Sequence, residues 1–334
     1  MTFLSDKALE RLRSHQAPDL SGTRYTLGEL IARGGMGAVY AAEDKKLARR
    51  VALKVLDTPD GNGELTCRLM REARILAQLE HPGIVPVHDV GALPDGRVFY
   101  TMKFVEGLRL DKYIVHLDSL PQRLRLFLRV CDAVAFAHAR GVLHRDLKPA
   151  NIMVGSFGEV LVMDWGLAKI LREHGPSLDD TVVISSQEAG SENDSTQSTL
   201  ITGYGTVMGT PGYMSPEQAR GETEKIDVRS DIFALGAVLN FVAVGDAQRK
   251  SPVLPRPLLA ICGKATADNP SARYASVSEL AADVSLHMDG LPVSAYAENV
   301  LERFGRLYKR HQIAILLITA YLIMRAVVLL LFRR

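Results

Sequence analysis

The chain has 334 residues, enough for one sizeable domain with appendages, and its 47% hydrophobic and 23% charged residues are ordinary for a globular protein. A net charge of +2, without interleaved basic and aromatic residues, gives no indication of a nucleic-acid partner. The three cysteines, Cys67, Cys131 and Cys262, are scattered, which argues against a disulfide framework or structural metal and favours a reducing compartment. The N-terminal residues lack the apolar stretch of a signal peptide.

The first part of the chain alternates short strand patterns with one helix. A charged leader over residues 1–24 is followed by strands expected at 25–31, 51–55, 84–90 and 97–104. Residues 65–79 have helical periodicity. Residues 32–37, between the first two strands, hold Gly34, Gly35 and Gly37, as in a hairpin whose backbone must approach another group closely.

The second part of the chain is mainly helical. Helices are expected at 131–139, 226–244, 258–267 and 277–288, and short strands at 152–154 and 159–163. Residues 173–198 are rich in Ser, Thr, Asp, Glu and Gly, a composition that cannot bury enough apolar surface to order itself. We therefore expect a disordered insertion at about 173–200, and residues 246–257 show no helical pattern.

One polar loop carries groups suited to phosphoryl transfer. Residues 144–151 bring together a carboxylate (Asp146), an ammonium (Lys148) and an amide (Asn151), and a second carboxylate, Asp164, follows the next strand and precedes a tryptophan and a glycine. Phosphoryl transfer needs a base that orients a hydroxyl, a cation beside the moving charge and oxygen ligands for a hard metal ion. A solvated turn would explain a lone Asp-x-Lys, but not eight ordered positions followed by a spaced Asp-x-Gly.

These residues resemble the catalytic loop and metal-binding motif of protein kinases, in the form found in the eukaryotic-like serine/threonine kinases of bacteria. The resemblance implies an α+β, two-lobed fold over residues 25–290, with a small β-rich N-lobe (25–105) and a larger helical C-lobe (106–290). It implies ATP and Mg2+ as cofactors. Asp146 would be the catalytic base, Lys148 would contact the γ-phosphate, and Asn151 and Asp164 would hold magnesium.

The resemblance assigns the nucleotide site to the first lobe. Residues 32–37 match the glycine-rich loop, with Ala32 in place of its first glycine. Lys54 matches the lysine that binds the α- and β-phosphates, and Glu72 is its expected ion-pair partner on the following helix. Singly, each contact would be an ordinary core or hairpin residue, and only their shared register indicates a nucleotide site. The expected contacts are Ala32, Gly34, Gly37, Val39, Ala52, Lys54, Met102, Lys103, Val105 and Met153.

The segment after Asp164 is expected to regulate the enzyme. An arginine directly before the catalytic aspartate, here Arg145, goes in this family with activation by a phosphate on the segment. Thr206 is the first candidate for autophosphorylation and Thr202 a secondary one, with Lys169 completing the phosphate pocket. Arg68 is either a further member of that pocket or a plain surface arginine.

The resemblance assigns roles to further residues outside the phosphate pocket. They are Trp165 in place of the usual Phe, His144 as a structural histidine, Thr210 near the catalytic loop, Asp231 bracing that loop, and Glu217 paired with Arg273.

The tail has the pattern of a membrane anchor. A basic juxtamembrane linker at 291–312 precedes residues 313–332, which only Thr319 and Arg325 interrupt among apolar or aromatic residues. This length spans a bilayer, and the positive charges before it predict a single-pass protein of the cell inner membrane with a cytoplasmic kinase domain. An arginine at the centre of a spanning helix, as expected for Arg325, makes the free energy of membrane insertion less favourable by about 2.5–3.5 kcal/mol. A helix lying in the membrane interface or packed against a partner helix is the alternative.

The sequence thus predicts a membrane-tethered serine/threonine kinase that phosphorylates protein substrates. Six candidates cover every catalytic role, which argues against a pseudokinase scaffold, although Ala32, Trp165 and the short stretch after Gly245 favour that alternative. A small-molecule kinase is the third reading, disfavoured by the Gly-Thr-Pro-x-Tyr and Ser-Pro-Glu segment at 209–217. Contact with membrane lipid follows from the tail, and a homodimer is an expectation from the family alone.

Overall fold

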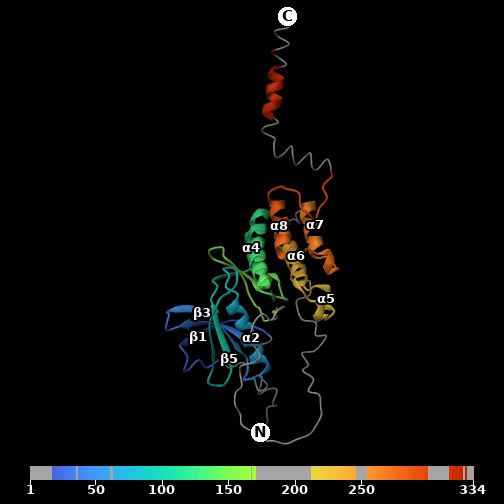
Figure 1. Cartoon of the computed structure of the whole chain (residues 1–334). Helices are drawn as coiled ribbons and strands as arrows, with labels where there is room; N and C mark the ends of the chain where they lie inside the picture. Colours follow the sequence, from blue (N-terminus) through green and yellow to red (C-terminus); the bar gives the residue numbers. More distant parts are fainter. Residues whose placement is uncertain are drawn as a thin grey trace, which may run out of the picture.

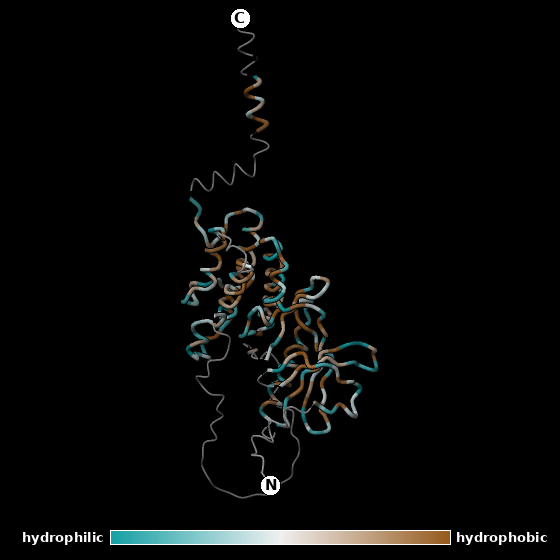
Figure 2. Tube along the Cα trace, turned by 180° about the vertical axis from the view of Figure 1, so that it is seen from behind, coloured by the Kyte–Doolittle hydropathy of each residue, from teal (hydrophilic) through white to brown (hydrophobic). Residues whose placement is uncertain are grey.

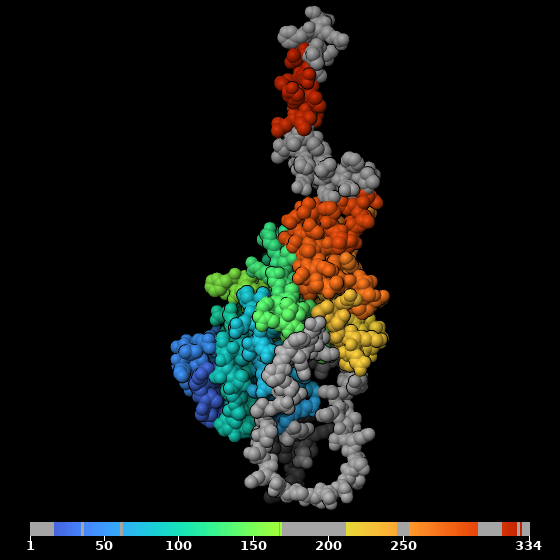
Figure 3. All heavy atoms as spheres, viewed as in Figure 1, coloured from blue at the N-terminus to red at the C-terminus, as the bar shows by residue number. Residues whose placement is uncertain are grey.

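The computed structural model describes residues 17–34, 37–60, 63–166, 168–170, 212–245, 254–299, 316–325 and 328. Most of them form two lobes, a smaller one built on a β-sheet and a larger one built on helices (Figures 1 and 3). The two-lobed α+β architecture expected from the sequence is therefore confirmed. The insertion expected at about 173–200 lies outside the described residues.

The small lobe is a five-stranded antiparallel sheet with one long helix. The strands lie in the order β1 (Tyr25–Arg33), β2 (Gly37–Asp44), β3 (Arg49–Leu56), β5 (Val98–Lys103) and β4 (Val87–Ala92), and the helix is α2 (Glu64–Gln78). Successive side chains of β3 alternate between two cores, as the period of a strand requires. Val51, Leu53 and Val55 pack into a cluster confined to this lobe, whereas Ala52 and Leu56 join the core shared with α2 and the large lobe.

Strand β4 begins three residues later than the pattern over 84–90 predicts. Pro86 lacks a backbone N–H and cannot donate to a ladder, so pairing with β5 starts at Val87. Ile84 instead forms an isolated parallel bridge with Val162, whose N–H donates to the Gly83 carbonyl at 2.8 Å. This segment consequently ties the small lobe to a strand of the large one.

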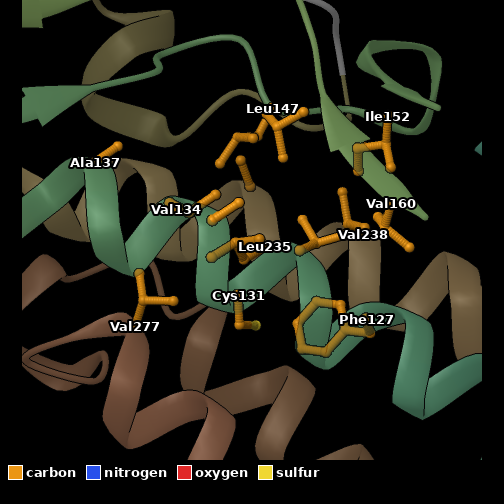
Figure 4. Packing of buried hydrophobic residues seen from close by; sticks show 14 of the residues in the cluster. Phe127, Cys131, Val134, Ala137, Leu147, Ile152, Val160, Leu235, Val238 and Val277 are labelled. Atoms are coloured by element: carbon orange, nitrogen blue, oxygen red, sulfur yellow. The ribbon is translucent and has the colours of Figure 1, made fainter. Parts of the chain in front are cut away.

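The large lobe packs three helices around a buried centre. They are α4 (Leu120–Ala139), α6 (Val228–Val244) and α8 (Val277–Met288), with α7 (Arg256–Ala265) beside them. In Figure 4, Phe127, Val134 and other apolar side chains of α4 meet Leu235 and Val238 of α6. Helix α4 begins well before residue 131, because the Ser119 hydroxyl accepts the N–H of Gln122 and a proline occupies the first turn.

Short strands and turns carry the loops between the lobes. Strands β6 (Gly107–Arg109), β8 (Ile152–Gly155) and β9 (Val160–Val162) form one small sheet, and β7 (Val142–Leu143) pairs with β10 (Lys169–Ile170). The remaining short helices are α3 (Leu110–Tyr113), η1 (Ile114–His116), η2 (Pro149–Asn151), α5 (Pro216–Ala219), η3 (Thr223–Lys225) and η4 (Pro270–Ala272).

The compact large lobe continues past Gly290, where the sequence suggested that a linker begins. The carboxylate of Asp283 in α8 accepts the Ser294 N–H at 2.8 Å, the Ser294 hydroxyl at 2.8 Å and the Ala295 N–H at 3.1 Å. It also accepts the Tyr274 hydroxyl at 2.8 Å, and Val293 is buried between these contacts. The first residues after α8 are therefore part of the folded lobe.

Near the C-terminus, residues 316–325 and 328 are helical and coloured largely as hydrophobic in Figure 2. Their large apolar side chains are exposed. In the part of the chain that the structure describes, no helix combines the length and the apolar character that crossing a membrane requires. Most of the 291–312 linker, and residues 313–315, 326–327 and 329–332 of the apolar stretch, lie outside the described residues.

Candidate active site

Lys54 and Glu72 form a buried ion pair between β3 and α2. The ammonium of Lys54 donates to both carboxylate oxygens of Glu72, at 2.7 and 2.8 Å, and lies 3.6 Å from Asp164 Oδ1. Burial lowers the pKa of Lys54, but the charges of Glu72 and Asp164 and their hydrogen bonds outweigh it, so the pKa lies above its ordinary value. Lys54 is therefore a permanent cation facing the space between the lobes.

Tyr100 is a third member of this cluster that the sequence reading did not single out. It lies directly opposite Lys54 in the β3–β5 ladder, and its hydroxyl donates to Glu72 Oε1 at 2.8 Å. Burial, and then the charge and hydrogen bond of Glu72, raise the pKa of Tyr100 well above its ordinary value. The alternation of side chains along a strand could have indicated this contact in the sequence, because residues two apart on β5 face the same helix.

Three side chains meet on the loop that joins β7 to β8. Lys148 Nζ donates to Asp146 Oδ2 at 2.7 Å, and the Asn151 amide donates to the same oxygen at 3.0 Å and to the Asp146 carbonyl at 2.8 Å. The side chain of Asp146 is only 13% exposed. Among the described residues both partners bind Oδ2, so Oδ1 is the carboxylate oxygen left to receive a proton.

Helix α6 fixes this loop through a side chain, Asp231, that binds backbone N–H groups of the loop. Asp231 accepts the N–H of His144 at 2.9 Å and the N–H of Arg145 at 2.8 Å, and it bonds to His138 Nε2 at 2.7 Å. Burial alone would raise the pKa of Asp231, but His138 and the backbone N–H of His144 hold it below its ordinary value. Asp231 is therefore an anion that organises the residues before Asp146, as the motif resemblance implies.

Asp164 follows β9 on a tightly held turn. It adopts a left-handed conformation, with φ at 59°, which aspartate tolerates better than most residues. Trp165 behind it is completely buried, donates its indole N–H to the Val162 carbonyl at 3.3 Å, and lies 4.6 Å from the ring of His144. His144 Nε2 in turn bonds to the Met163 carbonyl at 2.9 Å, so this histidine braces the turn.

Three of the expected nucleotide contacts, Val39, Ala52 and Met102, lie close to Lys54 in the small-lobe sheet. Ala52 pairs with Met102 in the β3–β5 ladder and Val39 pairs with Lys54 in the β2–β3 ladder, while Met153 lies on β8. The Lys103 N–H already donates to the Pro86 carbonyl at 3.1 Å, so this N–H is not available to the ring nitrogens of adenine. Val105 follows directly after this strand and is buried.

The two described glycines of the hairpin serve different purposes, and Ala32 fits in β1 beside them. Among the described residues, a Cβ on Gly34 would meet nothing nearer than the Gly37 carbonyl at 4.0 Å. A Cβ on Gly37 would lie within 2.1 Å of the Val55 carbonyl. Gly37 is therefore required by the close approach of β2 to β3, whether or not it also faces phosphate.

The donor set between the lobes suits magnesium. Asn151 uses its amide nitrogen on Asp146, which leaves its carbonyl oxygen for a cation, and the Asp164 carboxylate is 51% exposed. Within the described residues no three His, Cys, Asp or Glu side chains gather into a metal cage. Two oxygen donors still fit Mg2+, which keeps several waters and is usually bound through one or two carboxylates together with substrate phosphates.

The expected regulatory residues are only partly described. Burial lowers the pKa of Arg145, whose backbone is left-handed with φ at 71° and whose carbonyl accepts the Gln218 amide at 2.8 Å. Lys169 pairs through its backbone with Leu143. Arg68 donates to Glu64 at 2.6 Å, one helical turn away, which favours the plain surface reading. Thr202, Thr206 and Thr210 lie outside the described residues.

Glu217 and Arg273 form the expected ion pair below the catalytic loop. The guanidinium of Arg273 donates to both oxygens of Glu217, at 2.7 and 2.9 Å, and the Ser230 hydroxyl donates to the same carboxylate at 2.7 Å. Neither charged side chain is more than 1% exposed. This pair joins α5 to Arg273, the residue that directly follows η4.

Comparisons with known proteins agree with this arrangement. The model of the protein kinase domain family matches residues 25–251. The serine/threonine-protein kinase PknD of Chlamydia trachomatis is 37% identical over 307 residues, covering 80% of this chain and 32% of that protein. PknD of Chlamydia felis is 35% identical over 306 residues, covering 80% and 31%. The chain thus spans about a third of the length of these relatives.

A solved structure shares the architecture. The crystal structure of the Mycobacterium tuberculosis PknI kinase domain has a TM-score of 0.54 and 26% sequence identity, and the match covers 81% of this chain and 99% of that one. The residues that the family model matches, 25–251, include Lys54, Glu72, Asp146 and Asp164. The chain belongs to the protein kinase family, and within it resembles the serine/threonine kinases of bacteria.

Proposed function

We propose that the protein is a serine/threonine protein kinase that transfers the γ-phosphate of ATP to hydroxyl groups of protein substrates. The observation that carries this proposal is the preformed cluster of Lys54, Glu72, Asp146 and Lys148 at the junction of the lobes. The similar Chlamydia protein is named a serine/threonine-protein kinase, which supports the same activity, and the similar Mycobacterium structure is a kinase domain. Recovery of phosphoserine and phosphothreonine from a labelled acceptor protein is the expected result, and phosphotyrosine alone would contradict it.

Each catalytic group has a task set by its contacts. Asp146 orients the acceptor hydroxyl and takes its proton at Oδ1, since Lys148 and Asn151 hold Oδ2. Lys148 lies beside this carboxylate, where it contacts the transferring phosphate and the charge that develops there. Lys54 binds the α- and β-phosphates. Asn151 and Asp164 would hold magnesium, which when bound neutralises part of the negative charge of the phosphates.

The adenine base binds against the connection between the lobes. Val39 and Ala52 cover one face and Met153 the other, with Met102 at the rear, and the Lys103 carbonyl and Val105 backbone receive the polar edge of the base. Gly34 gives the phosphates room to approach the hairpin backbone. These roles rest on the shared register of β2, β3 and β5 with the family motif.

A pseudokinase scaffold is the alternative to an active enzyme. Ala32 and Trp165 depart from the family motif. Ala32 pairs regularly with Val39 in the β1–β2 ladder, and Trp165 fits a closed pocket with its indole N–H satisfied. Neither departure disturbs the ion pair at Lys54 or the carboxylate of Asp146, so catalysis is the stronger reading.

Activation depends on phosphorylation of the segment after Asp164. Thr206 is the principal site and Thr202 a secondary one, and a phosphate there pairs with Arg145 and Lys169. Support comes from Arg145, which directly precedes the proposed catalytic base Asp146. Thr206→Ala is expected to lower the activity of the protein at least about tenfold. Unchanged activity after this substitution would refute the assignment.

A C-terminal helix tethers the kinase to the cell inner membrane. Residues 313–332 are long and apolar enough to span a bilayer, and the basic residues at 301–310 keep the lobes on the cytoplasmic side. The helical turns at 316–325 expose large apolar side chains by 55–69%. Flotation of the full chain with liposomes, but not of a variant ending at residue 310, is the expected result. A full chain that stays soluble without lipid or detergent would contradict tethering.

Protein substrates and a second copy of the chain are the proposed partners. Protein substrates follow from the kinase family, whereas the homodimer rests on the family expectation alone. Analytical ultracentrifugation of the kinase lobes tests this proposal, because a dimer would have twice the mass of the monomer. No feature of the chain indicates a nucleic-acid partner.

A further inference from the structure

The hydroxyl of Tyr100 joins strand β5 directly to helix α2. It donates to Glu72 Oε1 at 2.8 Å, and the two residues are 1% and 2% exposed. Tyr100 faces α2 because it lies opposite Lys54 in the ladder, so β3, β5 and α2 each contribute one side chain to a closed cluster. A hydrogen bond to a carboxylate that is shielded from water is stronger than one at the surface.

Glu72 accepts three hydrogen bonds in this cluster. Lys54 donates to Oε1 at 2.7 Å and to Oε2 at 2.8 Å, and Tyr100 adds the third, to Oε1. The ammonium of Lys54 also lies 5.9 Å from the centre of the Tyr100 ring. Lys54 thus lies near both partners, whereas Glu72 is the one hydrogen-bond partner of the Tyr100 hydroxyl among the residues that the structure describes.

Binding of a nucleotide affects the hydrogen bonds of Lys54 and Tyr100 to Glu72 differently. The three protons of Lys54 must be shared with the phosphates once ATP binds, which weakens its hold on Glu72. Tyr100 has a single O–H proton, which already lies on Glu72 Oε1, so in our account this bond is kept when ATP binds. The raised pKa of Tyr100 means that its hydroxyl remains protonated at every physiological pH, so it is a permanent donor.

We propose that Tyr100 is a positioning residue for phosphoryl transfer, whose hydroxyl holds Glu72 and helix α2 in place while Lys54 engages the nucleotide. The inference rests on the proposed role of Lys54 in binding phosphates. Helix α2 is consequently seated before any ligand arrives. Tyr100 touches neither nucleotide nor acceptor, and acts only through Glu72.

The substitution Tyr100→Phe in the full chain removes this hydroxyl and keeps the ring. We expect kcat/KM for MgATP to fall about tenfold, because one hydrogen bond to a buried carboxylate is lost and Lys54 is held less firmly. The KM for the acceptor protein should not change, since Asp146 and its loop are untouched. Backbone amides of α2 should exchange with deuterium faster than in the unsubstituted protein.

Tyr274→Phe is a matched control for this substitution. Tyr274 is also 1% exposed and also donates to a buried carboxylate, Asp283, at 2.8 Å, but it lies in the large lobe away from Lys54. We expect Tyr274→Phe to leave kcat/KM for MgATP unchanged. An unchanged value for Tyr100→Phe, or an equal fall in both variants, would overturn the proposal.

The proposal also predicts non-additive behaviour with Glu72. In a Glu72→Gln background the charge that Tyr100 holds is absent, so adding Tyr100→Phe should change kcat/KM less than about twofold. A further tenfold fall in that background would mean that Tyr100 acts elsewhere. Lys54→Met separates the two claims: if it is fully active the role of Lys54 fails, and if it is inactive while Tyr100→Phe is normal only the inference fails.

One measurement needs no substitution. Deuterium exchange of the α2 amides Leu69 to Leu76 should be slow in the full chain without nucleotide, and MgATP should slow it little further. Rapid exchange that becomes slow only with MgATP would show that α2 is seated by the ligand, and would overturn the proposal even if Tyr100→Phe did not fold.

Discussion

The carboxylate of Asp231 holds Arg145 in a backbone conformation that arginine rarely adopts. Oδ1 accepts the Arg145 N–H at 2.8 Å while φ of Arg145 is 71°, a left-handed value that costs a non-glycine residue about 1–2 kcal/mol. Oδ2 accepts the neighbouring N–H of His144 at 2.9 Å. Asp231 is 1% exposed, so these bonds are not shared with water. The position of Asp146 is therefore set by a residue of α6.

Asp231→Asn is expected to lower kcat about 10- to 100-fold and to leave the KM for MgATP nearly unchanged. The amide offers one acceptor oxygen where the carboxylate offers two, so one of the two N–H groups becomes unsatisfied and the loop loses its fixed geometry. Steady-state kinetics measure this. Asp227→Asn, which changes the N-cap of the same helix, is the control and should retain full kcat. Equal losses in both variants would indicate damage to α6 in general.

Lys54→Met is expected to lower kcat/KM for MgATP at least about 100-fold. The substitution keeps the length of the side chain but leaves Glu72 buried with Tyr100 as its remaining described partner, and removes the cation that faces the phosphates. Lys46→Met, at an exposed lysine in the turn between β2 and β3, is the control and should behave as the unsubstituted protein. Full activity of Lys54→Met would rule out its assigned role.

The Glu217–Arg273 ion pair is expected to make stability depend on pH below 5. Burial alone would raise the pKa of Glu217, but the hydrogen bonds from Arg273 and Ser230 lower it from 4.5 to about 2. A folded pKa below the unfolded one stabilises the protein at neutral pH by about 3 kcal/mol, and this contribution disappears as the pH falls from about 5 towards 2.

Glu217→Gln tests this contribution. Its free energy of unfolding should be several kcal/mol below that of the unsubstituted protein at pH 7, and the difference should shrink as the pH falls from 5 to 3. Trp165, the single tryptophan of the chain and fully buried, reports unfolding by fluorescence. A difference that stays constant across this pH range would contradict the predicted linkage.

Removal of the residues after Gly290 is expected to destabilise the large lobe. A chain ending at residue 290 loses the Ser294 and Ala295 donors of Asp283 and exposes the site of Val293. The loss of about 2–4 kcal/mol corresponds to a fall of about 5–10 °C in Tm. A chain ending at residue 299 is the control and should melt like longer chains. Equal melting temperatures for both would show that the segment contributes nothing.

Motif spacing predicted the members of the site better than it predicted the ends of the elements. Lys54, Glu72, Asp146, Asn151 and Asp164 were identified through the resemblance to protein kinase motifs, whose polar residues stand at fixed distances between apolar segments. The start of β4 was misplaced because Ile84 and Val85 are apolar enough for a strand, while the missing N–H of Pro86 decides the pairing. Such a boundary depends on hydrogen bonding that hydrophobic periodicity does not report.

Residues that act through contacts far apart in the sequence were harder to predict. Tyr100 is 28 positions from Glu72, and its role depends on how closely α2 approaches β5. Gly37 was expected to face phosphate, but the approach of β2 to β3 already requires it. The residues after Gly290 were assigned to a linker because no periodic pattern marks the backbone donors that Asp283 collects.

The most direct test of the account is transfer of labelled phosphate from MgATP to an acceptor protein by the full chain and by Asp146→Asn. The asparagine keeps the size of the side chain and an oxygen for Lys148, but it cannot take a proton from the acceptor hydroxyl. We expect transfer by the unsubstituted protein and a rate about 10²–10⁴-fold lower for Asp146→Asn, with nucleotide binding preserved. Equal rates, or nucleotide binding with no transfer by either protein, would contradict the proposed catalysis.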